Sequence, residues 1–211
     1  MPQILHEKLH EHSSWALWHI EEGIAELQES LQANQPSATE LDVIKSEKQK
    51  LEWLSSRLLL RQLAKEYKID YPDVVKDEHG KPFLHNTAAH ISLSHSYPYA
   101  SAIIHTRQPV GIDIEKPRQQ LLRIGPRILH PEELSAAGDE VQKLCIYWAA
   151  KEALYKCYGR RGLTFQDEIF IEPFLLQQQG QLRGRIHTRA VKEEHTLHYR
   201  YHNDLLICFS L

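Results

Sequence analysis

The stretch Val110-Gly111-Ile112-Asp113-Ile114-Glu115 alternates apolar and acidic residues, which predicts a short β-strand. Successive side chains of a strand point to opposite faces, so Asp113 and Glu115 share one face. Two neighbouring carboxylates repel each other unless water or a cation lies between them, and their oxygen atoms suit a hard ion such as Mg2+. A strand with one hydrated face at a sheet edge explains the same alternation, so the pair alone leaves both interpretations open.

A helical pattern from about Asp139 to Tyr158 supplies a second set of charged residues. Trp148, Glu152 and Lys156 are spaced four apart and form a stripe along one helix face, and Lys151 lies beside it. Alone, Glu152 and Lys156 are also typical of a surface ion pair worth roughly 0.2–0.5 kcal/mol. Together with the strand, however, the helix provides three carboxylates and two lysines. A metal-bound pyrophosphate requires that combination, because carboxylates hold the cation and lysines bind the remaining oxygens.

Both halves of the chain run through helices and then strands. This order predicts an α+β molecule with a boundary near Gln108-Pro109, giving halves of residues 1–109 and 110–211. The residues from Ser94 to Pro98 are expected to form the bend of a hairpin. Helices are predicted from Glu21 and Glu22 through Leu31, and at about Leu41 to Tyr67, Leu121 to Leu129, from Pro131 onward, and Asp139 to Tyr158 with Gly159 as C-cap. Strands are predicted at Trp15 to Ile20, His90 to Leu93, Tyr99 to His105, Ile169 to Leu176, Gln181 to Thr188, His195 to Tyr201 and Leu205 to Phe209.

The amino-acid composition limits the kinds of partner that this protein is expected to bind. The 211 residues carry a net charge of -3, which argues against a general nucleic-acid binder. The apolar runs are far shorter than a membrane span, and Met1 to His12 lacks the apolar core of a signal peptide. Three cysteines form neither an even disulfide framework nor a CxxC metal pair. We therefore expect a cytoplasmic protein that binds neither nucleic acid nor membrane.

At these residues the sequence resembles the 4'-phosphopantetheinyl transferases, specifically the larger, monomeric, surfactin-synthetase-activating type. Four pieces carry the resemblance, in the order and spacing of the family, and they lie between about Arg57 and Gly162. They are Gly80-Lys81-Pro82, Ser92-Leu93-Ser94-His95-Ser96, Gly111-Ile112-Asp113-Ile114-Glu115 and Trp148-Ala149-Ala150-Lys151-Glu152-Ala153-Leu154-Tyr155-Lys156.

The resemblance implies a monomeric enzyme of two pseudo-symmetric halves, each a small antiparallel sheet packed with a long helix, and coenzyme A bound in the cleft between them. The implied reaction transfers the phosphopantetheine arm of coenzyme A to a serine of an apo acyl or peptidyl carrier protein. Adenosine 3',5'-bisphosphate is released. This makes the chain a holo-[acyl-carrier-protein] synthase by expectation, with the carrier as its protein partner.

The resemblance also assigns roles to residues. Asp113, Glu115 and Glu152 would ligate Mg2+, and oxygen ligands serve Mn2+ as well. Glu152 would help to deprotonate the incoming serine, and Lys156 would stabilise charge on the transferring phosphate. For Lys151, phosphate binding and a surface position are both open, as is the choice among Lys45, Lys48 and Lys50 for a contact with coenzyme A. The expected coenzyme A ligands are Arg57, Lys81, Ser94, His95, Asp113, Lys151 and Lys156.

Two other functions fit part of the pattern. A metal-dependent nuclease also uses an acidic pair, a further glutamate and a lysine, but it requires a basic groove, and no E-x-K tripeptide follows the acidic pair directly. A non-catalytic module that binds coenzyme A or a carrier protein has no chemical need for the three carboxylates and Lys156. Labelling of a carrier, DNA cleavage, and binding without turnover distinguish the three.

Overall fold

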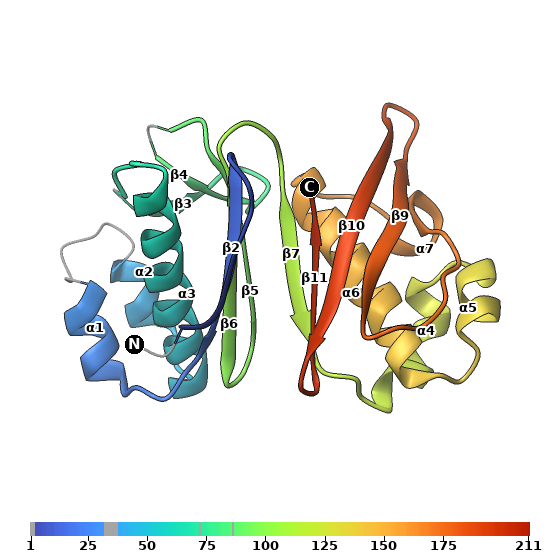
Figure 1. Cartoon of the computed structure of the whole chain (residues 1–211), viewed down its shortest axis with the longest axis horizontal. Coiled ribbons are helices and arrows are strands. Elements are labelled where there is room, and N and C mark those ends of the chain that lie inside the picture. The colour runs from blue at the N-terminus through green and yellow to red at the C-terminus, as the bar shows by residue number, and fades with distance from the viewer. Residues whose placement is uncertain (1–2, 32–37, 72, 86) are drawn as a thin grey trace. The chain divides into compact units, whose positions relative to one another are not determined.

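The computed structural model describes residues 3–31, 38–71, 73–85 and 87–211. The chain divides into a first unit, Met1–Pro109, and a second unit, Val110–Leu211. Each unit contains an antiparallel β-sheet with one long helix against one face, so the predicted α+β fold class is confirmed (Figure 1). No helix within the described ranges combines the length and the hydropathy that crossing a bilayer requires.

The sheet of the first unit has the strand order β1-β2-β6-β5, and every neighbouring pair is antiparallel. A separate two-stranded sheet is formed by β3 and β4. In chain order the elements are β1 (Gln3–His10), β2 (Ser13–His19), α1 (Ile24–Leu31), α2 (Ala38–Val43), α3 (Glu47–Glu66), β3 (Val74–Lys76), β4 (Pro82–Leu84), β5 (His90–Ser96) and β6 (Tyr99–His105).

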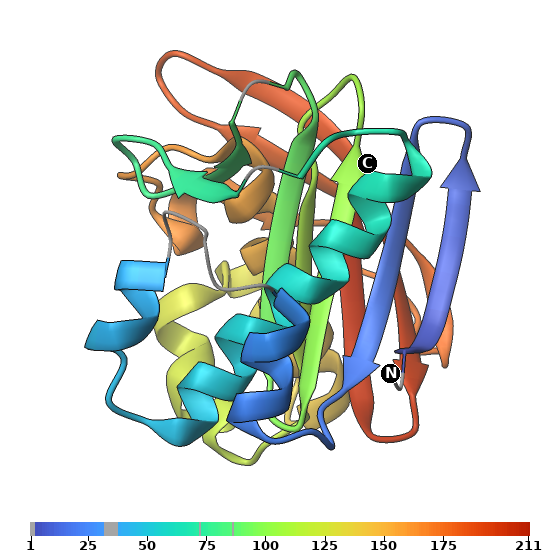
Figure 2. The same ribbon diagram turned by 90° about the vertical axis from the view of Figure 1, so that its left-hand side faces the viewer.

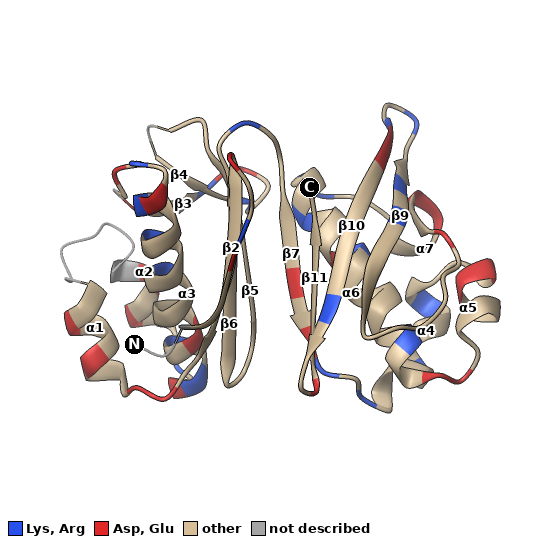
Figure 3. Ribbon diagram, in the orientation of Figure 1, with Lys and Arg blue, Asp and Glu red and all other residues tan. Residues whose placement is uncertain are grey.

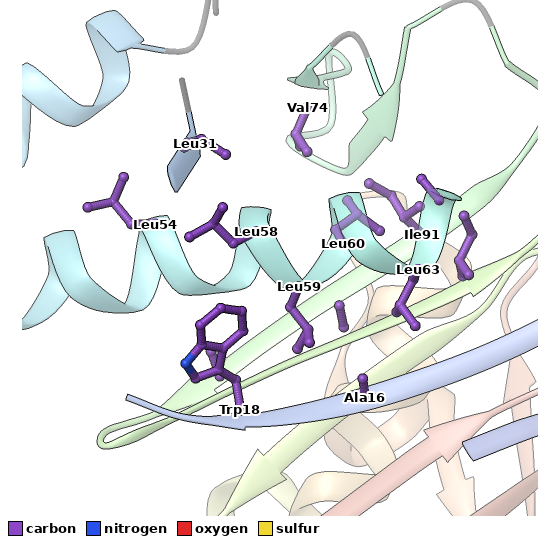
Figure 4. Close-up of a cluster of buried hydrophobic side chains, with 14 of the residues drawn as sticks. Ala16, Trp18, Leu31, Leu54, Leu58, Leu59, Leu60, Leu63, Val74 and Ile91 are labelled. Carbon is purple, nitrogen blue, oxygen red and sulfur yellow. The ribbon is translucent and has the colours of Figure 1, made fainter. Parts of the chain in front are cut away.

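The first unit is held together by α3, which crosses the strands of its sheet (Figure 2). Leu59 and Leu63 point from α3 toward the strands, where Trp18 of β2 lies near Leu59 and Ala16 of β2 lies below Leu63 (Figure 4). Leu54 and Leu58 point to the other side of the helix, and both are also buried. Apolar residues on more than one side are typical of a helix enclosed within its unit, so α3 contributes to this core on both sides.

Two predictions for the first unit were wrong. The polar segment before the first predicted strand is itself a strand, β1, because it pairs along the edge of β2 and needs no buried face of its own. The single helix predicted from Leu41 to Tyr67 is two helices, α2 and α3. The interruption falls before Ser46, whose Oγ accepts a hydrogen bond from the backbone N–H of Gln49 at 3.4 Å and so starts α3 as an N-cap.

A buried histidine ends β6. The Nδ1 atom of His105 accepts hydrogen bonds from the backbone N–H groups of Arg107 and Gln108, both at 3.0 Å. The His105 side chain is buried, and its ring centroid lies 5.2 Å from that of His10 and 6.4 Å from that of His12. This site therefore favours a neutral imidazole with an acceptor at Nδ1.

Burial, followed by the nearby charges of His10 and His12, lowers the pKa of His105 to about 4. His90 and Arg107 act in the same direction. Because the folded pKa lies below the ordinary value of about 6.5, the unfolded chain binds more protons between pH 6.5 and pH 4. The contribution of His105 to stability is therefore complete above pH 6.5 and is lost as the pH falls through that range.

The wild type should lose free energy of unfolding between pH 7 and pH 5. We expect His105→Asn to make this loss about 2 kcal/mol smaller. An asparagine oxygen can replace Nδ1 as the acceptor but does not titrate. Urea unfolding of both proteins at the two pH values measures the difference. The exposed His187 serves as control, and His187→Asn should leave the pH dependence of the wild type intact. Equal pH dependence in wild type and His105→Asn would refute the assignment.

The sheet of the second unit has the strand order β7-β11-β10-β9-β8, again antiparallel throughout. The strand predicted from Ile169 to Leu176 ends early, since Pro173 follows closely and has no N–H group for a ladder bond. In chain order the elements are β7 (Gly111–Glu115), α4 (Gln120–Ile128), α5 (Pro131–Ala137), α6 (Val141–Tyr158), α7 (Phe165–Glu168), β8 (Ile169–Ile171), β9 (Gln179–His187), β10 (Lys192–His202) and β11 (Leu205–Ser210).

The long helix of the second unit, α6, packs against β7 and β11. It ends as predicted at Gly159, which has a left-handed backbone (φ 70°) and whose N–H donates to the carbonyl of Tyr155 at 3.0 Å. The predicted start of a helix at Pro131 is also confirmed, with Glu133 accepting from the backbone N–H of His130 at 2.7 Å. These ends fix where the charged stripe of α6 lies along the sheet.

Candidate active site

A glycine brings α6 unusually close to β7. A Cβ atom added to Gly111 would overlap the backbone oxygen of Ala153 and lie 2.8 Å from the backbone nitrogen of Cys157. The side-chain position of Gly111 therefore faces α6, and by strand alternation so do Asp113 and Glu115. The acidic face of the strand is directed at the helix that carries the second charged motif.

We expect Gly111→Ala to lower the free energy of unfolding by about 3 kcal/mol, because the clash is with backbone and neither element can relieve it by changing a rotamer. Chemical denaturation measures the loss. Gly125→Ala in α4 is the matched control within the same unit. There a Cβ would make ordinary contacts of 3.4 and 3.6 Å with two leucine side chains, so stability should change by less than about 0.5 kcal/mol. Equal stability of both variants would contradict the close approach.

Lys156 and Trp148 of the helix donate hydrogen bonds to the strand. Lys156 Nζ donates to Asp113 Oδ1 at 2.7 Å and to the backbone oxygen of Ile112 at 3.0 Å. Trp148 Nε1 donates to Glu115 Oε1 at 3.3 Å. Asp113 is buried, whereas 26 % of the Lys156 side chain is exposed, so its ammonium group can also reach a ligand. The contacts orient both carboxylates of β7 against α6.

Electrostatics bring Glu152 into the same group. Burial, together with the negative charge of Asp113, raises the pKa of Glu152 to about 7, and Glu115 adds to the rise. Burial and Asp113 likewise raise the pKa of Glu115. Figure 3 shows the acidic positions on β7. Three neighbouring carboxylates beside one lysine form a locally negative site, which a cation or a proton would stabilise.

Mg2+ is the ion that the sequence motif suggests, and the donors fit it chemically. All three side chains offer carboxylate oxygens, and their mutual repulsion is the condition that a divalent cation relieves. Within the described ranges, no group of three or more His, Cys, Asp or Glu side chains is already arranged as a metal site. The three side chains therefore fit Mg2+ by the chemistry of their oxygen donors.

The structure corrects the prediction for Lys151. This side chain is neither on the surface nor open to a phosphate, because it is completely buried. Its ammonium group lies 2.7 Å from Glu133 Oε2 and donates to the backbone oxygens of Phe165 at 2.7 Å and Ile169 at 2.6 Å. Lys151 points away from the charged stripe because it is one position from Glu152, about 100° around the helix. Its role is to join α6 to α5 and β8.

His95 and Ser94, predicted for the hairpin bend, lie within β5, which continues to Ser96. The strand is longer because Ser96 still pairs with Tyr99 in the register of the sheet. Adjacent strand residues face opposite sides, so Ser94 is buried while 53 % of the His95 side chain is exposed. His95 is thus accessible to a ligand, and the two side chains do not share a face.

The structure also corrects Arg57. Its guanidinium stacks on the ring of Trp53, 3.6 Å from the centroid, and Nη2 donates to Glu40 Oε2 at 3.1 Å. Only 6 % of the side chain is exposed. Buried cations are paired, and this one has its partners inside the first unit, so Arg57 is not part of the phosphate site that we propose.

Lys81 lies at the entrance to β4, after a turn in which Asp77 Oδ1 accepts from the backbone N–H groups of His79 at 2.9 Å and Lys81 at 2.8 Å. These bonds contribute to the lowered pKa of Asp77. Burial and the charge of Lys81 lower the pKa of His90, which places the ammonium near the start of β5. Lys81 is partly exposed and remains a candidate ligand.

Sequence reasoning missed three partners of the predicted residues: the donor Trp148 for Glu115, Glu133 for Lys151, and Glu52 for His95. Trp148 was visible as part of the stripe spaced by four. The two glutamates carried no signal, since a buried glutamate and a surface glutamate look alike in a helical pattern.

Comparison with known proteins shows which family model and which proteins this chain is similar to. Residues 109–209 match a family model described as the 4'-phosphopantetheinyl transferase superfamily. The chain is 31% identical over 137 residues to the 4'-phosphopantetheinyl transferase Sfp of Bacillus subtilis, covering 61% of this chain and 59% of that protein. It is 31% identical over 90 residues to the 4'-phosphopantetheinyl transferase gsp of Aneurinibacillus migulanus, covering 40% of this chain and 37% of that protein. The matches thus span about half the length of these relatives, and they confirm the predicted resemblance.

Proposed function

We propose that this chain, whose residues 109–209 match the 4'-phosphopantetheinyl transferase superfamily model, transfers the 4'-phosphopantetheine group of coenzyme A to a serine of an apo acyl or peptidyl carrier protein. The observation that carries the proposal is the meeting of two motifs. Asp113 and Glu115 face α6 at the level of Glu152 and Lys156, and no packing requirement explains three carboxylates there.

In the proposed reaction the serine oxygen bonds to the phosphorus that carries the pantetheine arm. The bond from that phosphorus to the bridging oxygen breaks, and adenosine 3',5'-bisphosphate leaves with this oxygen. Glu152 takes the hydroxyl proton, directly or through water, because a carboxylate beside the reacting phosphate is placed to act as a general base. Lys156 stabilises the charge that develops on the phosphate oxygens.

Asp113, Glu115 and Glu152 are proposed to hold Mg2+ or Mn2+, which when bound would neutralise pyrophosphate charge. Trp148 keeps Glu115 oriented for this purpose through its indole N–H. In the first unit, His95 and Lys81 are the proposed ligands for the phosphates of coenzyme A. All three cysteines are buried and none forms a disulfide, which supports a reducing, cytoplasmic setting, and we propose a monomer because one chain contains both units.

The test is intact-mass spectrometry of an apo acyl carrier protein incubated with this chain and coenzyme A, with and without Mg2+. We expect a mass gain of one phosphopantetheine that needs the metal. Absence of a gain across fatty-acid, polyketide and peptidyl carriers, with coenzyme A still bound in calorimetry, would replace the transferase by a binding module. Cleavage of DNA under the same conditions would favour a nuclease.

A further inference from the structure

A buried carboxylate lies behind the exposed His95. Glu52, in the first half of α3, is 5% exposed. Its Oε1 atom accepts a hydrogen bond from the backbone N–H of Tyr97 at 3.0 Å, and its Oε2 atom lies 3.3 Å from His95 Nδ1. The two oxygens of one side chain thus hold the end of β5 and the imidazole that this strand exposes.

This contact selects the proton at one ring nitrogen. An ionised carboxylate only accepts, so the pair requires a proton on His95 Nδ1. The other nitrogen, Nε2, is then the group of the ring that remains for a ligand. An anion at Nε2 can be bound only by a second N–H, and an imidazolium that donates to Glu52 on one side and to the anion on the other satisfies both.

A nearby lysine adds positive charge at the same place. The ammonium group of Lys48, one turn before Glu52 on α3, lies 5.4 Å from the ring centroid of Tyr97. Lys48 is exposed, and Tyr97 follows directly on β5. Among the three lysines that the sequence left open, Lys48 therefore has a contact with this hairpin. An imidazole N–H and an ammonium group at the same hairpin favour an anionic ligand.

We propose that Glu52 is a positioning residue for phosphate recognition, holding His95 through Nδ1 so that Nε2 donates to a phosphate oxygen of coenzyme A. This inference rests on the proposed function, which supplies the ligand. A carboxylate that orients a histidine from behind is a general device, because the hydrogen bond on one ring nitrogen determines what the other can do. The alternative is a purely structural role, in which Glu52 tethers the hairpin through the N–H of Tyr97.

The test measures the dissociation constant for coenzyme A by calorimetry, together with kcat. Glu52→Gln keeps the shape and an acceptor for Tyr97 but loses the charge that stabilises the imidazolium. We expect the affinity for coenzyme A to fall about 10-fold. This is the low end for the loss of a charge-assisted hydrogen bond, because His95 is half exposed. The value of kcat should stay within about two-fold of the wild type. Glu47→Gln, an exposed glutamate on the same helix, should change neither value.

A double-mutant cycle separates the two roles. In a His95→Ala background, Glu52→Gln should have no further effect on affinity, whereas an effect that does not act through His95 would cost the same in both backgrounds. Nitrogen-15 NMR of the imidazole should show the proton on Nδ1 in the wild type and its loss from that atom in Glu52→Gln. If Glu52→Gln does not fold, Glu52→Asp, which keeps the charge and shortens the reach, is measured in the same way.

The outcomes distinguish this inference from the proposed function. Wild-type protein that binds coenzyme A and labels a carrier, combined with unchanged affinity in Glu52→Gln, would overturn the positioning role alone. A wild type that does not bind coenzyme A would overturn both. An additive cycle would show that Glu52 does not act through His95 and would overturn the positioning role.

Discussion

Replacing Glu152 with glutamine is expected to lower kcat for carrier labelling about 1,000-fold. Glutamine keeps the size and hydrogen-bonding capacity of the side chain but cannot take the serine proton, and it contributes no charge to the proposed metal site. The expected loss falls in kcat because the proton transfer belongs to the transition state. Single-turnover labelling followed by mass spectrometry measures it.

The thermal stability of the folded protein serves as a control for this variant. Burial and neighbouring carboxylates raise the pKa of Glu152, so its charge opposes folding above neutral pH. Glu152→Gln should therefore unfold at the same temperature as the wild type or higher. Glu140→Gln, at the exposed start of the same helix, should retain full activity. A Glu152→Gln enzyme with more than a tenth of the wild-type kcat would exclude Glu152 as the base.

Replacing Lys151 with methionine is expected to lower the free energy of unfolding by about 3–5 kcal/mol. Methionine fills a similar volume, but it leaves Glu133 completely buried without its cation and removes the donor from two backbone oxygens. Chemical denaturation at pH 7 measures the loss. Lys143→Met, on the same helix and partly exposed, should cost less than about 1 kcal/mol.

The pH dependence of the stability lost in Lys151→Met identifies the cause of the loss. Burial already raises the pKa of Glu133, and Lys151 opposes that rise, so removing Lys151 raises this pKa further. A carboxyl whose folded pKa is raised favours the folded state at low pH, and this contribution is lost as the pH rises through the folded pKa. The destabilisation of Lys151→Met should therefore be smaller at pH 5 than at pH 8. A loss independent of pH would point to packing alone.

The sequence by itself determined the elements with strong local signals. The alternation in Val110 to Glu115, the C-cap at Gly159 and the acidic first turn after Pro131 depend on neighbours within a few residues, and all three were predicted correctly. The spacing by four also predicted which side chains of α6 share a face, because helix geometry is fixed. The resemblance to a known family followed from these same residues.

Tertiary structure decided the rest. A short polar segment became β1 because a neighbouring strand offered it an edge, which no local pattern records. Lys151 and Glu152 are adjacent in sequence, yet one is buried against Glu133 and the other faces Asp113 and Glu115, because β8 and α5 cover one side of α6 and β7 the other. Burial and long-range partners set the charge of each group. These depend on segments that are distant in the chain and meet only in the folded protein.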